Sequence, residues 1–289
     1  MIRFIFVFIL FVSVTFSQSE LIIRCDDTGM SHTANMGCQK LIDSGIPFST
    51  SVMFACPWWL EAVEILKNNP QISVGIHLTL NSEWKHYKWG PISGASVVPT
   101  LVDENGYFPH NEDAYVNGTY NINEVETELR TQIERALNSG LQIDYMDFHM
   151  LTAISTPGLK KLVVKLGKEY NLALSHTFNE AHVSLWDAKP ELKETKLVEA
   201  MKNLSRTNVN LVVMHLGLQN PEMIAMYDLN TPEDPNTVHL HREAELNALL
   251  SKKFRNEAKK NKVKFITYRD LVKKYGTNAD KNTIKSFKY

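Results

Sequence analysis

The segment Leu21-Ile22-Ile23-Arg24-Cys25-Asp26-Asp27-Thr28-Gly29-Met30 joins an apolar run to two adjacent carboxylates and a glycine. A short apolar run bounded by turn residues is typical of a buried strand. The carboxylates would then lie at the carboxyl end of that strand, where barrel and open α/β enzymes carry their chemistry. Because two neighbouring Asp side chains repel each other, a divalent cation beside them is one explanation for the pair. An Asp turn that caps the next helix is the other.

Strand-like and helix-like stretches alternate along the rest of the chain. Further strands are expected at 49–54, 72–80, 143–148, 172–175, 209–214 and 263–267. Helices are expected at 34–44, 58–67, 124–138, 158–168, 193–204, 242–260 and 269–275. This alternation is typical of a mostly parallel sheet with helical crossovers. The sequence therefore predicts a single α/β domain with a distorted or incomplete (β/α) barrel, and an open doubly wound sheet is the alternative.

The composition is that of an ordinary globular protein. The chain has 289 residues, of which 44% are hydrophobic and 22% charged, and its formal net charge is -1. A charge so close to zero supplies no field that would attract nucleic acid or an anionic membrane. We therefore expect no nucleic acid among the partners, and the sequence leaves the oligomeric state open, a homo-oligomer included.

The first 17 residues differ from the rest. Arg3 precedes an apolar run over 4–14, and Thr15-Phe16-Ser17 follows it, a pattern typical of a secretory signal peptide. The apolar run is shorter than a membrane span requires. We expect cleavage of residues 1–17, a secreted or periplasmic protein and no membrane span after cleavage; an uncleaved anchor is the alternative. In an oxidising compartment the three cysteines could form at most one disulfide.

The segment 81–122 is long, aromatic and without clear periodicity. Such a segment in a compact domain is typical of an active-site lid or a binding loop. Its aromatic side chains, Trp84 among them, would suit stacking on sugar rings, and ordinary packing of the loop is the alternative.

Asp26, Asp27, His77, His149 and His215 each lie at or near the end of a predicted apolar strand. In a parallel barrel these strand ends converge. Asp27, His77 and His149 offer a carboxylate and two imidazoles, which suffice for a hydrolytic metal site. Asp26 could then accept a proton from water, and His215 could donate one to a leaving group. Ordinary structural roles for the histidines are the alternative.

A metal, a base and an acid together describe hydrolysis of an amide or an ester. Aspartate and imidazole suit zinc, whereas a more hydrated site would admit magnesium. Two histidines and a carboxylate also describe non-haem iron oxygenases. Those use a close His-x-Asp pair, whereas Asp27 and His77 lie 50 positions apart.

Several motifs follow one another in a characteristic order. They are Ile22-Ile23-Arg24-Cys25-Asp26-Asp27-Thr28-Gly29-Met30-Ser31, Ser49-Thr50-Ser51-Val52-Met53, Val74-Gly75-Ile76-His77-Leu78-Thr79-Leu80, Asp147-Phe148-His149, Met214-His215-Leu216-Gly217 and Arg242-Glu243-Ala244-Glu245-Leu246. In these motifs the chain resembles the YdjC-like carbohydrate deacetylases, the family of chitooligosaccharide deacetylases. The resemblance spans essentially the mature chain and implies that residues 18–289 form one YdjC-like deacetylase (β/α) barrel domain.

The resemblance implies a distorted (β/α) barrel, a divalent metal ion, zinc or magnesium, and a hydrolase that removes an N-acetyl group from an amino sugar. An acetylated oligosaccharide would be the substrate. Asp27, His77 and His149 would bind the metal, Asp26 would be the base and His215 the acid.

Three further residues are expected near the substrate: His176, Arg242 and Trp84. For Arg242 an ion pair at the start of a helix is the alternative. Leu151 and Ala153 occupy positions where the family usually has further histidines. They motivate the alternative function, a glycan-binding protein on the same fold that has lost catalysis.

Overall fold

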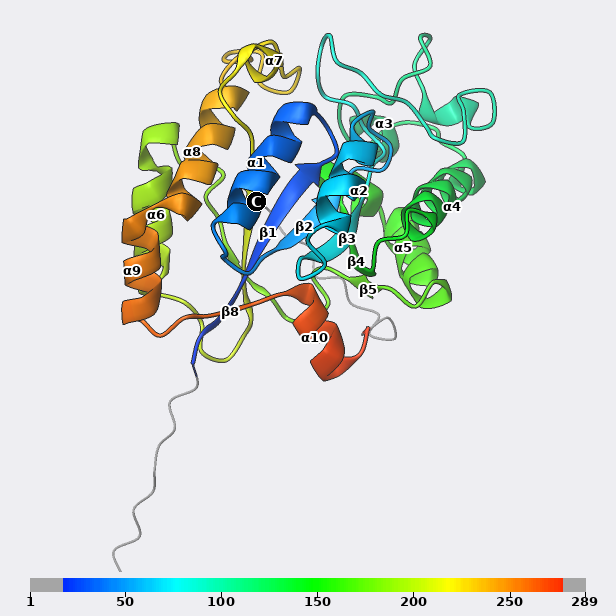
Figure 1. Ribbon diagram of the computed structural model, residues 1–289. Helices are drawn as coiled ribbons and strands as arrows, with labels where there is room; N and C mark the ends of the chain where they lie inside the picture. Colours follow the sequence, from blue (N-terminus) through cyan, green and yellow to red (C-terminus); the bar gives the residue numbers. More distant parts are fainter. Residues whose placement is uncertain (1–17, 278–289) are drawn as a thin grey trace, which may run out of the picture.

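A computed structural model describes residues 18–277, so the expected signal peptide, residues 1–17, lies outside the described residues (Figure 1). The strands are β1 (Glu20–Thr28), β2 (Ser49–Val52), β3 (Ser73–Leu78), β4 (Ile143–Phe148), β5 (Ala173–Leu174), β6 (Ala181–Val183), β7 (Asn210–His215) and β8 (Lys264–Ile266). The α-helices are α1 (His32–Asp43), α2 (Trp59–Lys67), α3 (Asp113–Val116), α4 (Ile122–Asn138), α5 (Pro157–Glu169), α6 (Lys193–Ala200), α7 (Pro221–Ile224), α8 (Val238–Leu250), α9 (Lys252–Lys260) and α10 (Tyr268–Tyr275). Short 3-10 helices cover Pro99–Leu101, His149–Ile154 and Pro190–Leu192.

The strands form one parallel sheet in the order β5-β4-β3-β2-β1-β7-β6, and β8 pairs with the first residues of β1. The sheet curls into a half-barrel that helices surround, and the long loops gather beyond the carboxyl ends of the strands (Figure 1). Within residues 18–277 the end strands β5 and β6 do not pair with each other, so the barrel stays open. The predicted incomplete (β/α) barrel is therefore confirmed.

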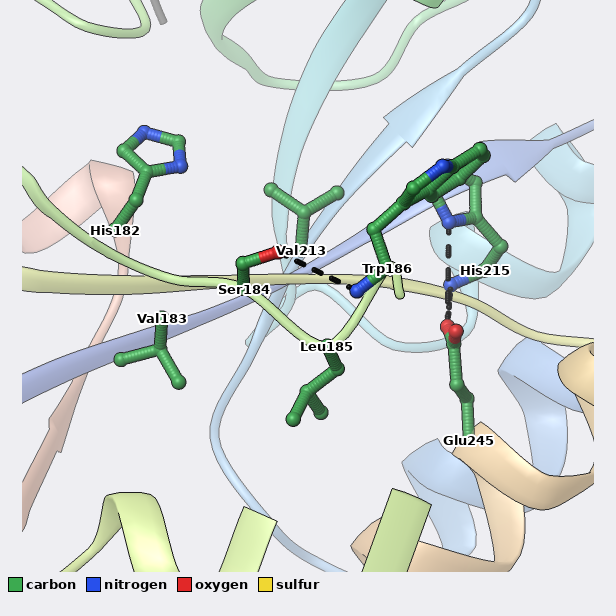
Figure 2. Close-up of a pocket in the computed structure, with 8 residues that line it drawn as sticks. All are labelled: His182, Val183, Ser184, Leu185, Trp186, Val213, His215 and Glu245. Carbon is green, nitrogen blue, oxygen red and sulfur yellow. Dashed lines mark hydrogen bonds and ion pairs between the residues drawn. The ribbon is translucent and has the colours of Figure 1, made fainter. Parts of the chain in front are cut away.

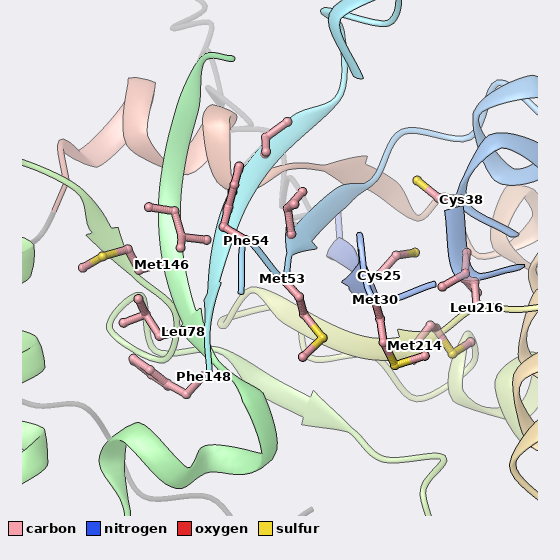
Figure 3. Packing of buried hydrophobic residues seen from close by; sticks show 14 of the residues in the cluster. Cys25, Met30, Cys38, Met53, Phe54, Leu78, Met146, Phe148, Met214 and Leu216 are labelled. Carbon is pink, nitrogen blue, oxygen red and sulfur yellow. The ribbon is translucent and has the colours of Figure 1, made fainter. Parts of the chain in front are cut away.

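The two faces of β1 explain where the site lies. Leu21, Ile23 and Cys25 point into the large core between the sheet and the helices, part of which Figure 3 shows. Ile22 points the other way, into a small apolar cluster inside the half-barrel. Because side chains alternate along a strand, Arg24 and Asp26 continue that inner face. The interior is thus apolar near the start of β1 and polar near its carboxyl end.

The inner apolar cluster is tightly packed. Tyr145 of β4 and Tyr268 of α10 are fully buried there, and their rings stack with centroids 4.2 Å apart. Gly75 of β3 leaves the room for this: a Cβ at Gly75 would lie 2.4 Å from the Tyr145 ring. This packing fills the half-barrel below the polar groups, so the carboxyl ends of the strands are the side from which a ligand can approach.

Local signals explain most of the element boundaries. The Ser31 side chain accepts a hydrogen bond from the main chain of Ala34 and begins α1, and Asn121 begins α4 in the same way. The expected helix over 242–260 is wrong as a single helix, because Ser251 adopts extended backbone angles and caps α9 instead. Strand β6 is absent from the expected strands, because three partly buried residues carry too little pattern.

The three cysteines, Cys25, Cys38 and Cys56, are free thiols buried in the core. Burial raises the pKa of each thiol. None of the helices within residues 18–277 has the length and apolarity needed to cross a membrane.

Candidate metal centre

Three buried side chains converge at the carboxyl ends of β1, β3 and β4. Asp27 Oδ1 lies 3.3 Å from His77 Nε2 and 3.3 Å from His149 Nδ1. The two ring nitrogens are themselves 3.3 Å apart. Ligand atoms that share one tetrahedral ion at about 2.0–2.1 Å are separated by roughly 3.3 Å. The predicted triad is therefore brought together with the spacing of a divalent metal site.

The backbone at the ends of β1 and β4 turns sharply to present these ligands. Asp27 has a φ of +64°, in the left-handed region that residues other than glycine rarely adopt. After His149, both Met150 and Leu151 also have positive φ, +48° and +59°. Such strained conformations cluster at functional sites, where surrounding contacts hold them.

The Asp27 carboxylate has one engaged oxygen and one without a hydrogen bond. Oδ2 accepts a hydrogen bond from Arg242 Nη2 at 2.5 Å, whereas the buried Oδ1 accepts none. Burial alone would raise the pKa of Asp27, but the Arg242 guanidinium and the imidazoles of His149 and His77 together outweigh burial, and the pKa falls well below the usual value. An ionised oxygen without a hydrogen-bond donor, beside two imidazoles, is what a cation would bind.

Each imidazole is held from behind by a buried carboxylate. His77 Nδ1 lies 2.8 Å from Asp147 Oδ1, and His149 Nε2 lies 2.9 Å from Glu83 Oε2. Burial opposes protonation, but these carboxylates raise the pKa of His77 to about 10 and that of His149 to about 9. A carboxylate on the distal nitrogen is the usual support of a metal-binding histidine, because it fixes the ring.

A second cluster of possible metal ligands shares His77 with the triad, but Arg24 neutralises both of its carboxylates. Asp26, His77 and Asp147 also bring three ligand atoms within 4.8 Å of one another. However, Arg24 donates to both oxygens of Asp26, at 2.8 and 2.7 Å, and its Nε lies 2.9 Å from Asp147. Burial raises the pKa of Asp147, but Arg24 and His77 overcome this and lower it to about 2. A guanidinium already satisfies this group, so the Asp27 triad is the better cation site.

His215 ends β7 directly opposite Asp26 of β1 in the sheet. Its main-chain N–H donates to Glu245 Oε2 at 2.7 Å, and its Nδ1 lies 3.9 Å from the same oxygen. Burial lowers the pKa of His215, so the imidazole is neutral at neutral pH. The sheet register thus places the expected acid beside the expected base.

The three expected substrate contacts lie around this centre but are themselves buried. Arg242 binds Asp27, and Trp84 packs beside the Arg242 guanidinium, 5.9 Å from ring centroid to Cζ. Arg242 Nη1 and Trp84 Nε1 make no hydrogen bond. His176 stacks on His182 with ring centroids 4.9 Å apart. Direct substrate contact by these three residues stays a prediction.

The aromatic loop is packed rather than open. Trp84, Trp89, Phe108 and Tyr115 are buried. Main-chain hydrogen bonds join the loop to the segment after β7, from Lys85 to Tyr227 and from Leu229 to Glu83. The loop delivers Glu83 to His149, a contact that no sequence pattern indicates. Asp147, which supports His77, belongs to the motif Asp147-Phe148-His149. Its position two residues before a candidate ligand is a signal that the sequence does offer.

The sequence of this chain is similar to those of known proteins. The sequence model of the family described as YdjC-like protein matches residues 20–260. A carbohydrate deacetylase of Thermoanaerobacter pseudethanolicus is 32% identical over 161 residues, which cover 54% of this chain and 60% of that protein. Carbohydrate deacetylase 1 of Listeria innocua is 27% identical over 259 residues, which cover 87% of this chain and 100% of that protein.

Solved structures share the fold. A candidate cellobiose-phosphate cleavage protein of Enterococcus faecalis V583 superposes with a TM-score of 0.73 at 21% identity, covering 88% of this chain and 99% of that one. The Xyl-CE4 domain of a xylanase from the hindgut metagenome of Trinervitermes trinervoides reaches 0.51 at 10% identity, covering 90% and 92%. Since the family's sequence model spans most of the described residues and the relatives it resembles are named accordingly, this chain belongs to the YdjC-like family of carbohydrate deacetylases.

Proposed function

We propose that this chain is a metal-dependent hydrolase that removes N-acetyl groups from an amino-sugar-containing carbohydrate of the chitooligosaccharide type. The observation that carries the proposal is the triangle of Asp27 Oδ1, His77 Nε2 and His149 Nδ1, with all three sides 3.3 Å. Its membership of a carbohydrate deacetylase family supports the substrate class.

Asp27, His77 and His149 would hold the ion, and zinc suits this donor set best. When bound, the ion would act as a Lewis acid that polarises the acetamide carbonyl and lowers the pKa of a water molecule. The carboxylates of Asp147 and Glu83 hold the two imidazoles in place from the far side. Magnesium, which prefers oxygen ligands and bound water, is the less favoured ion.

In the proposed reaction Asp26 accepts a proton from the attacking water, and Arg24 keeps its carboxylate in one orientation through two hydrogen bonds. Because its imidazole starts out neutral, His215 first takes up the proton that Asp26 removed from water and then donates a proton to the amide nitrogen as the C–N bond breaks. The products are acetate and a free amino sugar. The buried position of the site limits competing water.

Acetate release from N-acetylglucosamine oligomers tests the proposal. The metal-loaded parent should release acetate, a chelator should abolish it, and Asp26→Asn and His77→Ala should each lack it. His77→Ala should also fail to retain the metal, whereas Asp26→Asn should retain it. If the metal-loaded parent binds the oligomers but releases no acetate, the deacetylase proposal fails and the glycan-binding alternative takes its place.

We further propose that the protein acts outside the cytoplasm. The basic, apolar and small-residue pattern of residues 1–17 supports this. Mass spectrometry of the expressed protein should find a mature form beginning at Gln18 in the exported fraction. A cell-associated form that retains residues 1–17 would contradict the proposal.

A further inference from the structure

A small pocket opens beside His215, between the end of β7 and the segment that follows β6 (Figure 2). Its lining comes from β6 and the segment after it, from the end of β7 and from one residue of α8: His182, Val183, Ser184, Leu185, Trp186, Val213, His215 and Glu245. Val213 and His215 lie two positions apart on β7, so both point to the inner face of the half-barrel. The pocket therefore reaches His215, which lies opposite Asp26 in the sheet, on the side of β1 away from β3 and β4.

Trp186 stands out in this lining because it is exposed. Its side chain is 59% accessible, whereas Trp84 and Trp89 are 3% accessible. Its ring lies beside the His215 imidazole, with centroids 5.8 Å apart and planes at 71° (Figure 2). An exposed indole beside His215 leaves apolar surface in contact with water, which is unfavourable unless a ligand covers that surface. The C–H face of a pyranose ring is a natural cover, because it is apolar while its hydroxyls stay solvated.

The pocket lining suits an uncharged ligand. None of its eight described residues is Lys or Arg. Its one carboxylate, Glu245, is paired with the buried Lys193 Nζ at 2.8 Å. Burial and Arg24 lower the pKa of His182 to about 4, and burial lowers that of His215, so both imidazoles are neutral at neutral pH. A phosphate or carboxylate placed here would lose hydration without gaining a cation.

We propose that an uncharged sugar ring of the substrate lies over the mouth of this pocket and that Trp186 is the stacking platform of this subsite. The inference rests on the proposed deacetylase function and adds the position and the charge of the bound sugar. Trp186 would bind rather than react, so it contributes to substrate affinity and specificity.

Calorimetric binding separates this inference from the reaction itself. N,N′,N″-triacetylchitotriose is titrated into the metal-loaded Asp26→Asn variant, which leaves the sugar intact, with and without Trp186→Ala. Trp186→Ala should weaken binding at least about tenfold, and Trp186→Phe should keep it within about threefold. Because Trp186 is exposed, equal metal content and melting temperature should confirm that both variants are folded.

Unchanged affinity in Trp186→Ala, or no binding of the trisaccharide by the Asp26→Asn background, would overturn the inference. Acetate release by the parent with unaffected Trp186→Ala kinetics would do so while leaving the deacetylase function intact. Conversely, Trp186-dependent binding without acetate release would refute the deacetylase function alone.

Charge is tested with a matched pair of ligands. Diacetylchitobiose and its 6-phosphate are titrated into the same Asp26→Asn background. The phosphorylated sugar should bind at least about tenfold more weakly, because nothing in the pocket lining neutralises it. Equal or tighter binding of the phosphate would contradict the uncharged subsite.

Discussion

The half-barrel has two walls, one formed by β1, β3 and β4 and the other by β6 and β7, and their polar side chains differ in burial and in charge pairing. On the wall of β1, β3 and β4, the metal-ligand candidates are buried and each is held by a further charged group. On the wall of β6 and β7, His182, Trp186 and His215 are partly or largely exposed around a pocket. On the first wall, charged partners fix the orientation of the candidate metal ligands. On the second wall, most of the side chains around the pocket are accessible to solvent. The comparison separates the buried candidate metal ligands from the more exposed side chains around the pocket, where His215 also lies.

The largest expected effect concerns Arg24, at the centre of the first wall. Arg24→Ala leaves the buried carboxylates of Asp26 and Asp147 without their shared cation. We expect the free energy of unfolding to fall by about 3–5 kcal/mol, measured by urea titration of the metal-free protein. Arg24→Lys should lose less, because it keeps the charge. A loss below about 1 kcal/mol in Arg24→Ala would show that this wall does not depend on the ion pair.

Removal of one ligand from the triad is next in size. His77→Ala should weaken zinc binding roughly a hundredfold to a thousandfold, since zinc-site affinities of about 10–16 kcal/mol are shared among some four ligands. Competition with a chromophoric chelator measures the change. His182→Ala, on the other wall, is the matched control and should leave zinc affinity unchanged. Equal effects of the two substitutions would erase the distinction between the walls.

Glu83→Gln sharpens the comparison within the first wall. The amide keeps the shape of the side chain but removes the charge that holds His149 Nε2. Loss of such a supporting carboxylate lowers metal affinity about 10- to 100-fold. Glu245→Gln, whose carboxylate contacts His215 instead, is the control and should leave metal affinity intact. Zinc titration of both variants decides whether the loop residue supports the metal.

The smallest effect is expected at the second wall. His182→Phe keeps an aromatic ring against His176 but removes the 3.1 Å contact between His182 Nε2 and His176 Nδ1. The free energy of unfolding should drop by only about 0.5–1.5 kcal/mol, the net worth of one hydrogen bond. Thermal denaturation measures it. A loss as large as that of Arg24→Ala would mean that the wall of β6 and β7 is also a structural core.

Much of the centre could be predicted because its residues sit at strand ends. Short apolar runs predict the strands. Because the carboxyl ends of parallel strands lie at the same end of a barrel, Asp27, His77 and His149 are expected to lie close together. Glu83 could not be predicted, because it comes from a loop without periodicity and reaches His149 only through tertiary packing. Arg24 was visible as an unusual charge in an apolar strand, but its two partners were not.

Sequence by itself determined the alternation of strands and helices, the family and the residues that could bind a metal, since these follow from local patterns and ordered motifs. Only the tertiary structure decided that Arg24 binds Asp26 and that Arg242 binds Asp27. It also decided that Trp84 is buried whereas Trp186 is exposed. The physical reason is that burial and charge pairing depend on segments distant in the chain, and no local pattern records which of them will pack together.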